Sequence, residues 1–339
     1  MSNNRLGTPK GTTDFIVPSI GVAHEMTQLA IQKDDYVTLR KIYQYISSDN
    51  TIWGNADDYH NLATEYAKID DYLPAYKIVE HGLQQYPFNI DLLADGVYYG
   101  SNCQEYDNCE KFIKILADRP SGTWNWRAFT FTINYYKNKP DWTEDSTIIL
   151  DSYHAALAYA KICQQVLPKE EKGYLAESEI HLLLENYYRG NDKEKKSSQA
   201  DEEHEAALSI LLSAIKQETF CAVQCCLKYA DLLFEERQYE NVISICDQAL
   251  QYGEAQPSAR LGYFVYLSAQ SKDVLIHKNK AYNDFDKIKD VMQDYDAAYR
   301  SMDVMTYCNN IKNRATILSA KSGFPLPDSL TTKEPEAND

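Results

Sequence analysis

The sequence predicts an all-α fold, and three observations carry this prediction. Apolar residues recur with the 3.6-residue period of an amphipathic helix in many segments, as in residues 204–217 and 239–251. Strict alternation of apolar and polar residues, the pattern of a half-buried strand, is not sustained anywhere. The 339 residues include only 13 Gly and 11 Pro, too few for a turn-rich β sandwich or barrel.

The expected helices follow one another in pairs. The opening pair covers residues 22–50, the second covers 56–89, and the third covers 90–121. The fourth pair has helices at 123–137 and 150–168, because an inserted segment separates them.

The second half of the chain continues this pattern. Helices 174–189 and 204–217 are expected to pair across the charged stretch 189–203, which has the composition of an exposed loop. A further pair covers 223–254, and residues 258–321 follow as two or three longer helices that close the array.

Both ends of the chain have the polar, aperiodic composition of disordered tails. We therefore expect a tail over residues 1–20, helical repeats over 21–255, capping helices over 256–321 and a second tail over 322–339.

Residues 56–89 carry the clearest repeat. Residues of the required size occupy the characteristic positions of a helix–turn–helix unit, and these are Tyr59, Leu62, Ala63, Tyr66, Ala75, Val79, Gly82 and Pro87. Small residues let the two helices approach closely, and proline stops the second helix because it cannot continue one. This segment closely resembles a tetratricopeptide repeat (TPR).

The other pairs resemble the same repeat more weakly; Val242, for example, stands where a small residue is usual. A single helix pair cannot bury its apolar face, so neighbouring pairs must stack. The resemblance implies an all-α, TPR-like right-handed superhelical solenoid of antiparallel helix pairs. It also implies a concave groove lined by the first helix of each pair.

The charge balance narrows the choice of partner. The chain has 50 acidic and 34 basic residues, a formal net charge of -16. Binding a nucleic-acid backbone requires Lys and Arg to neutralise phosphates, so we expect no nucleic-acid partner. No stretch approaches the roughly 20 apolar residues of a membrane span, so none is expected.

The expected location is the cytoplasm. The N-terminal residues lack the apolar region of a secretory signal. The eight Cys lie mostly inside apolar runs, as reduced and buried thiols do.

No motif indicates catalysis or a cofactor. The patterns GxxxxGK(S/T), GxGxxG, GxSxG and HExxH are not found as functional motifs. The nearest candidate for a metal site is Cys221, Cys225 and Cys226, but zinc sites favour CxxC pairs and four ligands. Buried small thiols explain this cluster better. We expect no enzyme activity, no catalytic residue, no metal and no cofactor.

Tyrosine is the unusual feature of the composition, with 27 residues. Three expected first helices end in a tyrosine pair, and these are Tyr98–Tyr99, Tyr135–Tyr136 and Tyr187–Tyr188. Successive helical residues point about 100° apart, so one member packs inward and its neighbour faces the groove or the next repeat. Two interpretations stay open: at least one pair contacts a ligand, or the pairs only pack.

Many TPR proteins bind an acidic C-terminal peptide through a basic clamp in the groove. The resemblance places His60, Thr64, Ala94 and Asp95 at clamp positions of two consecutive repeats. None of the four is Lys or Arg, so the resemblance implies a neutral or basic peptide partner rather than an acidic one.

We therefore expect a non-enzymatic scaffold or adaptor for protein–protein interaction that holds a partner segment in its concave groove. The expected partner-binding residues are His60, Thr64, Tyr98, Arg127, Asn134, Tyr135, Asn186 and Tyr187. The alternative is a sensor of a peptide or small ligand that regulates a separate effector protein. Such sensors usually carry an N-terminal effector domain, for which residues 1–21 are too short, so the scaffold is favoured.

Overall fold

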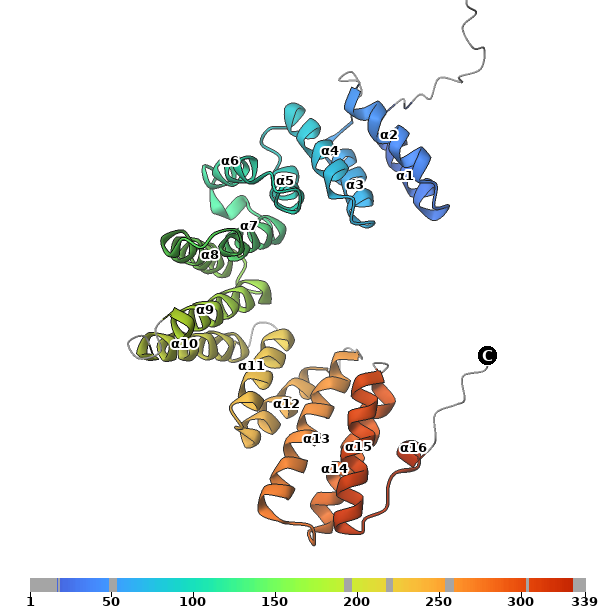
Figure 1. Ribbon diagram of the computed structural model, residues 1–339, viewed down its shortest axis with the longest axis vertical. Coiled ribbons are helices and arrows are strands. Elements are labelled where there is room, and N and C mark those ends of the chain that lie inside the picture. The colour runs from blue at the N-terminus through green and yellow to red at the C-terminus, as the bar shows by residue number, and fades with distance from the viewer. Residues whose placement is uncertain are drawn as a thin grey trace, which may run out of the picture. The chain divides into compact units, whose positions relative to one another are not determined.

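The computed structural model confirms the all-α class. It describes residues 17, 19–48, 54–191, 197–217, 222–253, 259–302 and 305–331. These residues form helices joined by turns, and no strand occurs among them (Figure 1).

The chain divides into two compact units, residues 1–168 (unit 1) and 169–339 (unit 2). The boundary falls inside the stretch 21–255 that the sequence analysis treats as one array. Unit 1 contains α1 (Ile20–Gln32), α2 (Tyr36–Ser48), α3 (Ala56–Ala67), α4 (Tyr72–Gln85), α5 (Ile90–Asn102), α6 (Tyr106–Ala117), η1 (Ser121–Thr123), α7 (Trp126–Asn138), η2 (Lys139–Trp142) and α8 (Ser146–Val166). Unit 2 contains α9 (Glu171–Asn191), α10 (Ser197–Ile215), α11 (Val223–Glu235), α12 (Tyr239–Gly253), α13 (Ala259–Asn279), α14 (Phe285–Ser301), α15 (Met305–Ser322) and α16 (Asp328–Thr331).

Five helix pairs share the same helix-ending turn, in which one residue takes a left-handed backbone conformation with φ between 52° and 64°. These residues are Asp34, Asp70, Gln104, Arg237 and Lys280. The next residue then donates its N–H to the carbonyl five residues earlier, at 2.8–3.0 Å. This is the Schellman motif, which normally carries glycine because the left-handed conformation costs other residues about 1–2 kcal/mol. The last of the five turns joins α13 and α14, so the repeat geometry extends into residues 256–321.

The packing of α3 against α4 follows the repeat pattern. Tyr59, Leu62, Ala63, Tyr66, Ala75 and Val79 are all at most 1% exposed. A methyl group added to Gly82 would come within 2.8 Å of the Tyr59 ring. The small residues therefore set how closely the two helices approach, as the sequence predicts.

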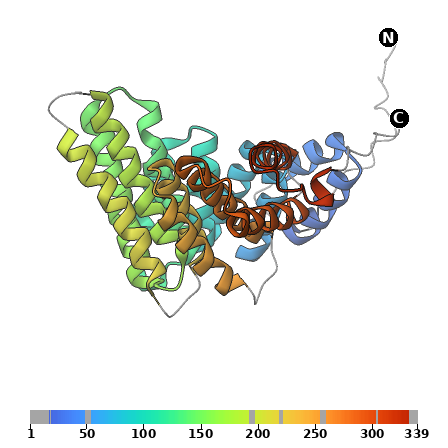
Figure 2. The same ribbon diagram turned by 90° about the horizontal axis from the view of Figure 1, so that it is seen from below.

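The predicted loop over residues 189–203 is shorter than expected. Helix α9 extends to Asn191 and α10 begins at Ser197, so residues 197–203 are helical, and α9 and α10 lie side by side (Figure 2). Ala200 is fully buried, and Arg189 bonds Asp201 at 2.9 Å. The charges in this stretch thus pair between helices, which composition alone did not reveal.

The predicted C-terminal tail also differs in its first part. Helix α16 packs on α14, and Leu330 is 6% exposed within the core formed by α13, α14 and α15. Residues 332–339 of that tail lie outside the described residues, as do residues 1–16 of the N-terminal tail.

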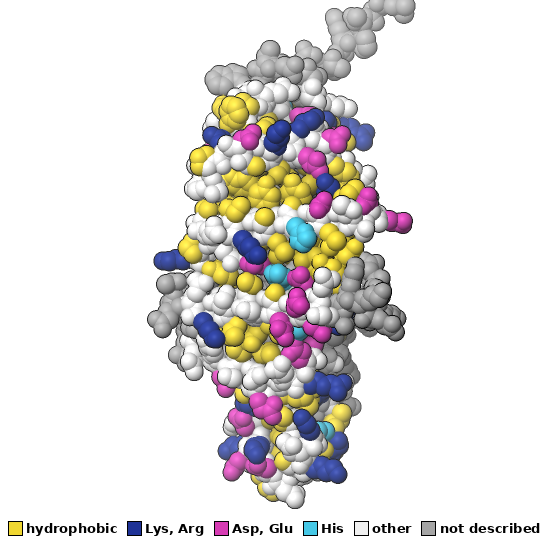
Figure 3. Space-filling model, turned by 90° about the vertical axis from the view of Figure 1, so that its left-hand side faces the viewer, with side chains coloured by type: hydrophobic (Ala, Val, Ile, Leu, Met, Phe, Trp, Pro, Cys, Tyr) yellow, Lys and Arg dark blue, Asp and Glu magenta, His cyan; other side chains and the backbone are white. Residues whose placement is uncertain are grey.

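Unit 1 has an apolar groove between the end of α6 and α8. Hydrophobic side chains gather in a band between α6 and α8 (Figure 3). The groove has a volume of about 420 Å³, and its aromatic rings come from Trp124, Phe129, Tyr136 and Tyr159. Tyr136 therefore lies on the side of α7 that faces α8, where its ring stacks on Tyr159 at 5.8 Å.

We expect Gln104→Gly to stabilise unit 1 by about 0.5–1 kcal/mol, because Gln104 is exposed and glycine adopts positive φ without strain. All four tryptophans, at positions 53, 124, 126 and 142, belong to unit 1. Urea unfolding followed by tryptophan fluorescence thus reports this unit. Gln104→Ala is the matched control and should bring no gain; equal gains for both variants would contradict the explanation.

Candidate binding site

Three neighbouring helices of unit 1 bring most of the predicted binding residues together. Helices α3, α5 and α7 pack in that order. They carry His60, Thr64, Tyr98, Arg127, Asn134 and Tyr135. Asn186 and Tyr187 lie on α9 in unit 2, so they belong to a different unit from the other six.

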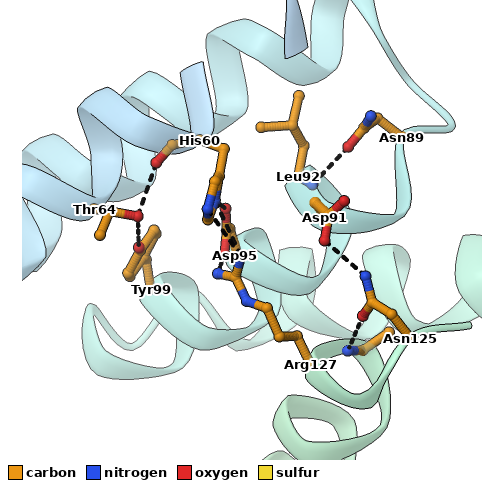
Figure 4. A network of polar contacts seen from close by, with 10 residues as sticks. His60, Thr64, Asn89, Asp91, Leu92, Asp95, Tyr99, Asn125 and Arg127 are labelled. Atoms are coloured by element: carbon orange, nitrogen blue, oxygen red, sulfur yellow. Dashed lines mark hydrogen bonds and ion pairs between the residues drawn. The ribbon is translucent and has the colours of Figure 1, made fainter. Parts of the chain in front are cut away.

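The centre of this surface is an ion-pair cluster of His60, Asp95 and Arg127 (Figure 4). Asp95 of α5 is fully buried; one carboxylate oxygen pairs with Arg127 of α7, and the other lies 2.6 Å from His60 Nδ1. The Arg127 guanidinium also lies 3.0 Å from His60 Nε2. A neutral imidazole with its proton on Nδ1 satisfies both contacts, since it donates to Asp95 and accepts from Arg127. One buried carboxylate thereby links all three helices.

The cluster carries little net charge. Burial raises the pKa of Asp95 above its ordinary value, although His60 and Arg127 act in the opposite direction. Arg127 remains in contact with the carboxylate while its side chain is 20% exposed. The guanidinium is thus partly compensated before any ligand arrives, so it is a weaker anchor for an acidic peptide than a free Lys or Arg.

Hydrogen bonds at the helix ends hold this arrangement in register (Figure 4). Asn125 caps α7 by accepting from Ala128 N–H, and its amide nitrogen donates to Asp91 of α5 at 2.7 Å. Asn89 caps α5 in the same manner. Thr64 hydroxyl donates to the carbonyl of His60 and lies 3.4 Å from Tyr99 hydroxyl. The side chains of Thr64 and His60 are therefore fixed by local contacts.

Next to the cluster lies a pocket of about 390 Å³, here called the aromatic pocket. It is lined by Tyr98, Ser101, Asn102, Phe131, Asn134, Tyr135, Asn138, Asp141 and Trp142. Tyr98 stacks on Phe131 with ring centroids 4.6 Å apart. Arg127 lies over the same Phe131 ring at 5.5 Å, so the cluster and the pocket adjoin.

The two members of a tyrosine pair differ in burial. Tyr99 and Tyr135 are 3% and 2% exposed, so they pack between helices, although Tyr135 still forms part of the pocket wall. Tyr98 is half-buried and lies beside the surface of α5 and α7. The structure thus gives Tyr135 a packing position that the sequence analysis left open.

Sequence reasoning missed several residues of the pocket. The sequence analysis places Asp95 at a clamp position but not among the binding residues. A carboxylate within the apolar stretch 92–100 indicates a buried charge that needs a partner, and this signal could have identified it. Phe131 follows Arg127 by one helical turn. Asp141 and Trp142 come from η2, whose position beside α7 no periodicity predicts.

In unit 2, the surroundings of Asn186 and Tyr187 are dominated by histidine–carboxylate contacts. Asn186 is exposed, and Tyr187 is half-buried with its ring 5.6 Å from that of Tyr188. His204 of α10 lies between Glu185 of α9, at 2.8 Å from Nδ1, and Glu236 after α11, which contacts Nε2. Both nitrogens donate only when the ring is protonated. The imidazolium therefore links three helices.

The described residues hold no group of three or more His, Cys, Asp or Glu arranged to bind a metal ion. Cys225 and Cys226 are fully buried in the core of unit 2, and Cys221 lies outside the described residues. Within the described part of the chain, no helix combines the length and the apolar character needed to cross a membrane.

No family model matches this sequence, and no curated protein is significantly similar to it. Similar solved structures include a thermophilic TPR protein of Thermus thermophilus, at 15% identity and a TM-score of 0.42, covering 58% of this chain and 90% of that one. A TPR protein of Parabacteroides merdae matches at 15% identity and a TM-score of 0.42, and the match covers 88% of this chain and 98% of that one. A monomeric mutant of IFIT1, solved with m7Gppp-AAAA, matches at 12% identity and a TM-score of 0.44, and the match covers 89% of this chain and 63% of that one.

These three TM-scores lie below 0.5, so no function is transferred from them. By its own features the chain has a TPR-like helical-repeat fold. These features are the consecutive helix pairs, the turn that five of them share and the buried positions of residues 56–89.

We expect Arg127→Met to destabilise unit 1 by about 2–4 kcal/mol, because it leaves the Asp95 carboxylate buried with a single polar partner. Adding Asp95→Asn should recover part of this loss, since the buried charge is then gone. Urea unfolding by tryptophan fluorescence measures both variants. A double variant no more stable than Arg127→Met alone would show that the buried charge is not the cause.

We expect His204 to titrate above pH 6.5. Burial lowers the pKa of His204, but hydrogen bonds to Glu236 and Glu185 outweigh burial and raise it. With a folded pKa above the unfolded value, this contact stabilises unit 2 fully below about pH 6.5 and is lost as pH rises through the folded pKa. Proton NMR of the histidine rings measures the midpoint, and Glu236→Gln should lower it. A wild-type midpoint at or below 6.5 would contradict the assignment.

Proposed function

We propose that this protein is a non-enzymatic interaction scaffold whose unit 1 holds a partner segment on the surface formed by α3, α5 and α7. The observation that carries the proposal is the continuity of the ion-pair cluster and the aromatic pocket. Arg127 belongs to the cluster and lies over Phe131 of the pocket wall, so the two features form one surface.

The chemistry of this surface suits a peptide. Asn102, Asn134 and Asn138 offer amide donors and acceptors along the pocket, which match the N–H and C=O groups of an extended chain. Tyr98 and Phe131 offer apolar area with little loss of side-chain entropy on binding. Helices α5 and α7 carry all of these residues, so the surface is held ready before the partner binds.

The charges favour a neutral or basic partner. Arg127 lies at the centre of the surface, and its pairing with Asp95 partly compensates its charge. The pocket contributes Asp141, and the whole chain has a net charge of -16, which slows the approach of an acidic peptide. The expected partners are neutral or basic proteins or peptides, and nucleic acid is not among them.

We expect Asn134→Lys to weaken partner binding at least tenfold, because it places a bulky cation at the edge of the pocket and on the path of a basic segment. Affinity capture from extracts of cells that express the protein, with mass spectrometry, compares this variant with the wild type. Asn309→Lys, at an exposed position of α15 in unit 2, is the matched control.

Loss of the same proteins from the Asn134→Lys sample alone supports the proposal. Capture that is equal for all three proteins contradicts binding at this surface. Tryptophan fluorescence and circular dichroism confirm beforehand that the variants are folded.

A further inference from the structure

We propose that the aromatic pocket binds a cationic side chain, that of arginine or lysine, from the partner segment. This inference rests on the function proposed above and assigns the chemistry of one subsite within it. The function proposed above allows a neutral or a basic partner segment. The present inference requires that the segment contain a basic residue.

The first argument is the charge of the pocket wall. The described residues that line the pocket include one carboxylate, Asp141, and neither Lys nor Arg. A cation entering the pocket therefore meets a carboxylate that attracts it, whereas an anion is repelled.

The second argument is that two cations near the pocket, Arg127 and Lys139, are already paired. Arg127 is held by Asp95 on the side of the ion-pair cluster. Lys139 lies in η2 beside Asp141 in sequence, but its ammonium lies 2.5 Å from a carboxylate oxygen of Glu110. Neither of these cations is therefore used to neutralise Asp141.

The third argument is the kind of groups that line the pocket. Four aromatic residues contribute to the wall, and these are Tyr98, Phe131, Tyr135 and Trp142. Tyr135 is buried and Phe131 lies between Tyr98 and Arg127, so Tyr98 and Trp142 are the rings that can face a ligand. Aromatic rings attract cations through their quadrupoles, and this attraction grows when water is excluded. Rings and a carboxylate together suit a group that is both charged and carried on an apolar stem, as in Arg and Lys.

The fourth argument concerns hydrogen bonding. Arg and Lys side chains donate hydrogen bonds and accept none. Asn102 uses one of its two amide protons in a bond to the carbonyl of Tyr98 at 2.8 Å, and its amide oxygen can accept from a donor on the ligand. Ser101 likewise donates its hydroxyl to the same carbonyl. Together with the Asp141 carboxylate, the amide oxygens of Asn102, Asn134 and Asn138 give the pocket wall acceptors for a cationic side chain.

The size of the pocket agrees with such a guest. Its volume of about 390 Å³ lies near the lower end of ligand sites, which span roughly 300–1,000 Å³. One long side chain with its neighbouring backbone fits this volume, whereas a large cofactor does not.

The test uses the full chain labelled with 15N at its tryptophan indoles. The probes are the peptide Ac-Gly-Arg-Gly-NH2 and the same peptide with uncharged citrulline in place of arginine. Four indole signals are expected, and Trp142→Phe identifies the one from the pocket. We expect the arginine peptide to shift the Trp142 signal with saturation, and the citrulline peptide to bind at least fivefold more weakly.

The carboxylate is tested with Asp141→Asn, which keeps the shape of the side chain and removes its charge. We expect this variant to bind the arginine peptide about fivefold more weakly. Asp151→Asn, at an exposed position of α8, is the matched control and should bind as the wild type does. An unshifted Trp142 signal, equal binding of the two peptides, or equal binding by Asp141→Asn would each overturn the inference.

The two proposals fail in different ways. In one case, Asn134→Lys loses its partner, but the wild type and Asp141→Asn each bind the arginine and the citrulline peptide with equal affinity. The partner-binding surface then stands, and the cation subsite is wrong. If the arginine peptide binds as expected but Asn134→Lys retains every captured protein, the subsite stands and the partner-binding surface is wrong.

Discussion

The structure depends on a constraint at the turns: where only a few residues join two antiparallel helices, the chain must reverse tightly between them. Five pairs meet this constraint with a residue in the left-handed region, and none of the five is glycine. Each such residue carries a conformational cost of about 1–2 kcal/mol, which the contacts of the paired helices offset. Small residues such as Ala63 and Ala75 then allow close contact between α3 and α4. The first helices of successive pairs are thereby placed next to one another.

The binding surface follows from this placement. Because α3, α5 and α7 are neighbours, a single buried carboxylate, Asp95, can contact side chains from both flanking helices. Burying a charge is costly unless it is paired, so the contacts to His60 and Arg127 fix the relative positions of the three helices. The ion pair with Asp95 also partly compensates the charge of Arg127. What the surface offers to a ligand is therefore amide groups, aromatic rings and one carboxylate.

The extra segment between α7 and α8 changes the repeat at the end of α7. It places η2, with Asp141 and Trp142, beside the end of α7, where Trp142 contacts Tyr135 and completes the aromatic pocket. A separate apolar groove lies between α6 and α8, and Tyr136 lines it from the other side of α7. The adjacent tyrosines 135 and 136 thus serve two different surfaces, as expected for side chains about 100° apart on a helix.

The sequence by itself determined the all-α class, the repeat at residues 56–89 and the helices that carry His60, Tyr98 and Arg127, because periodicity and residue size act locally along a helix. Several features were decided by tertiary structure alone. The burial of Asp95 and Tyr135, the helical state of residues 197–203 and the packing of Leu330 depend on partners distant in sequence. The position of η2 depends on how an inserted segment folds back on α7, and no local pattern encodes it. Local propensity thus determined which residues form helices, and long-range contacts decided which side chains meet to form the pocket.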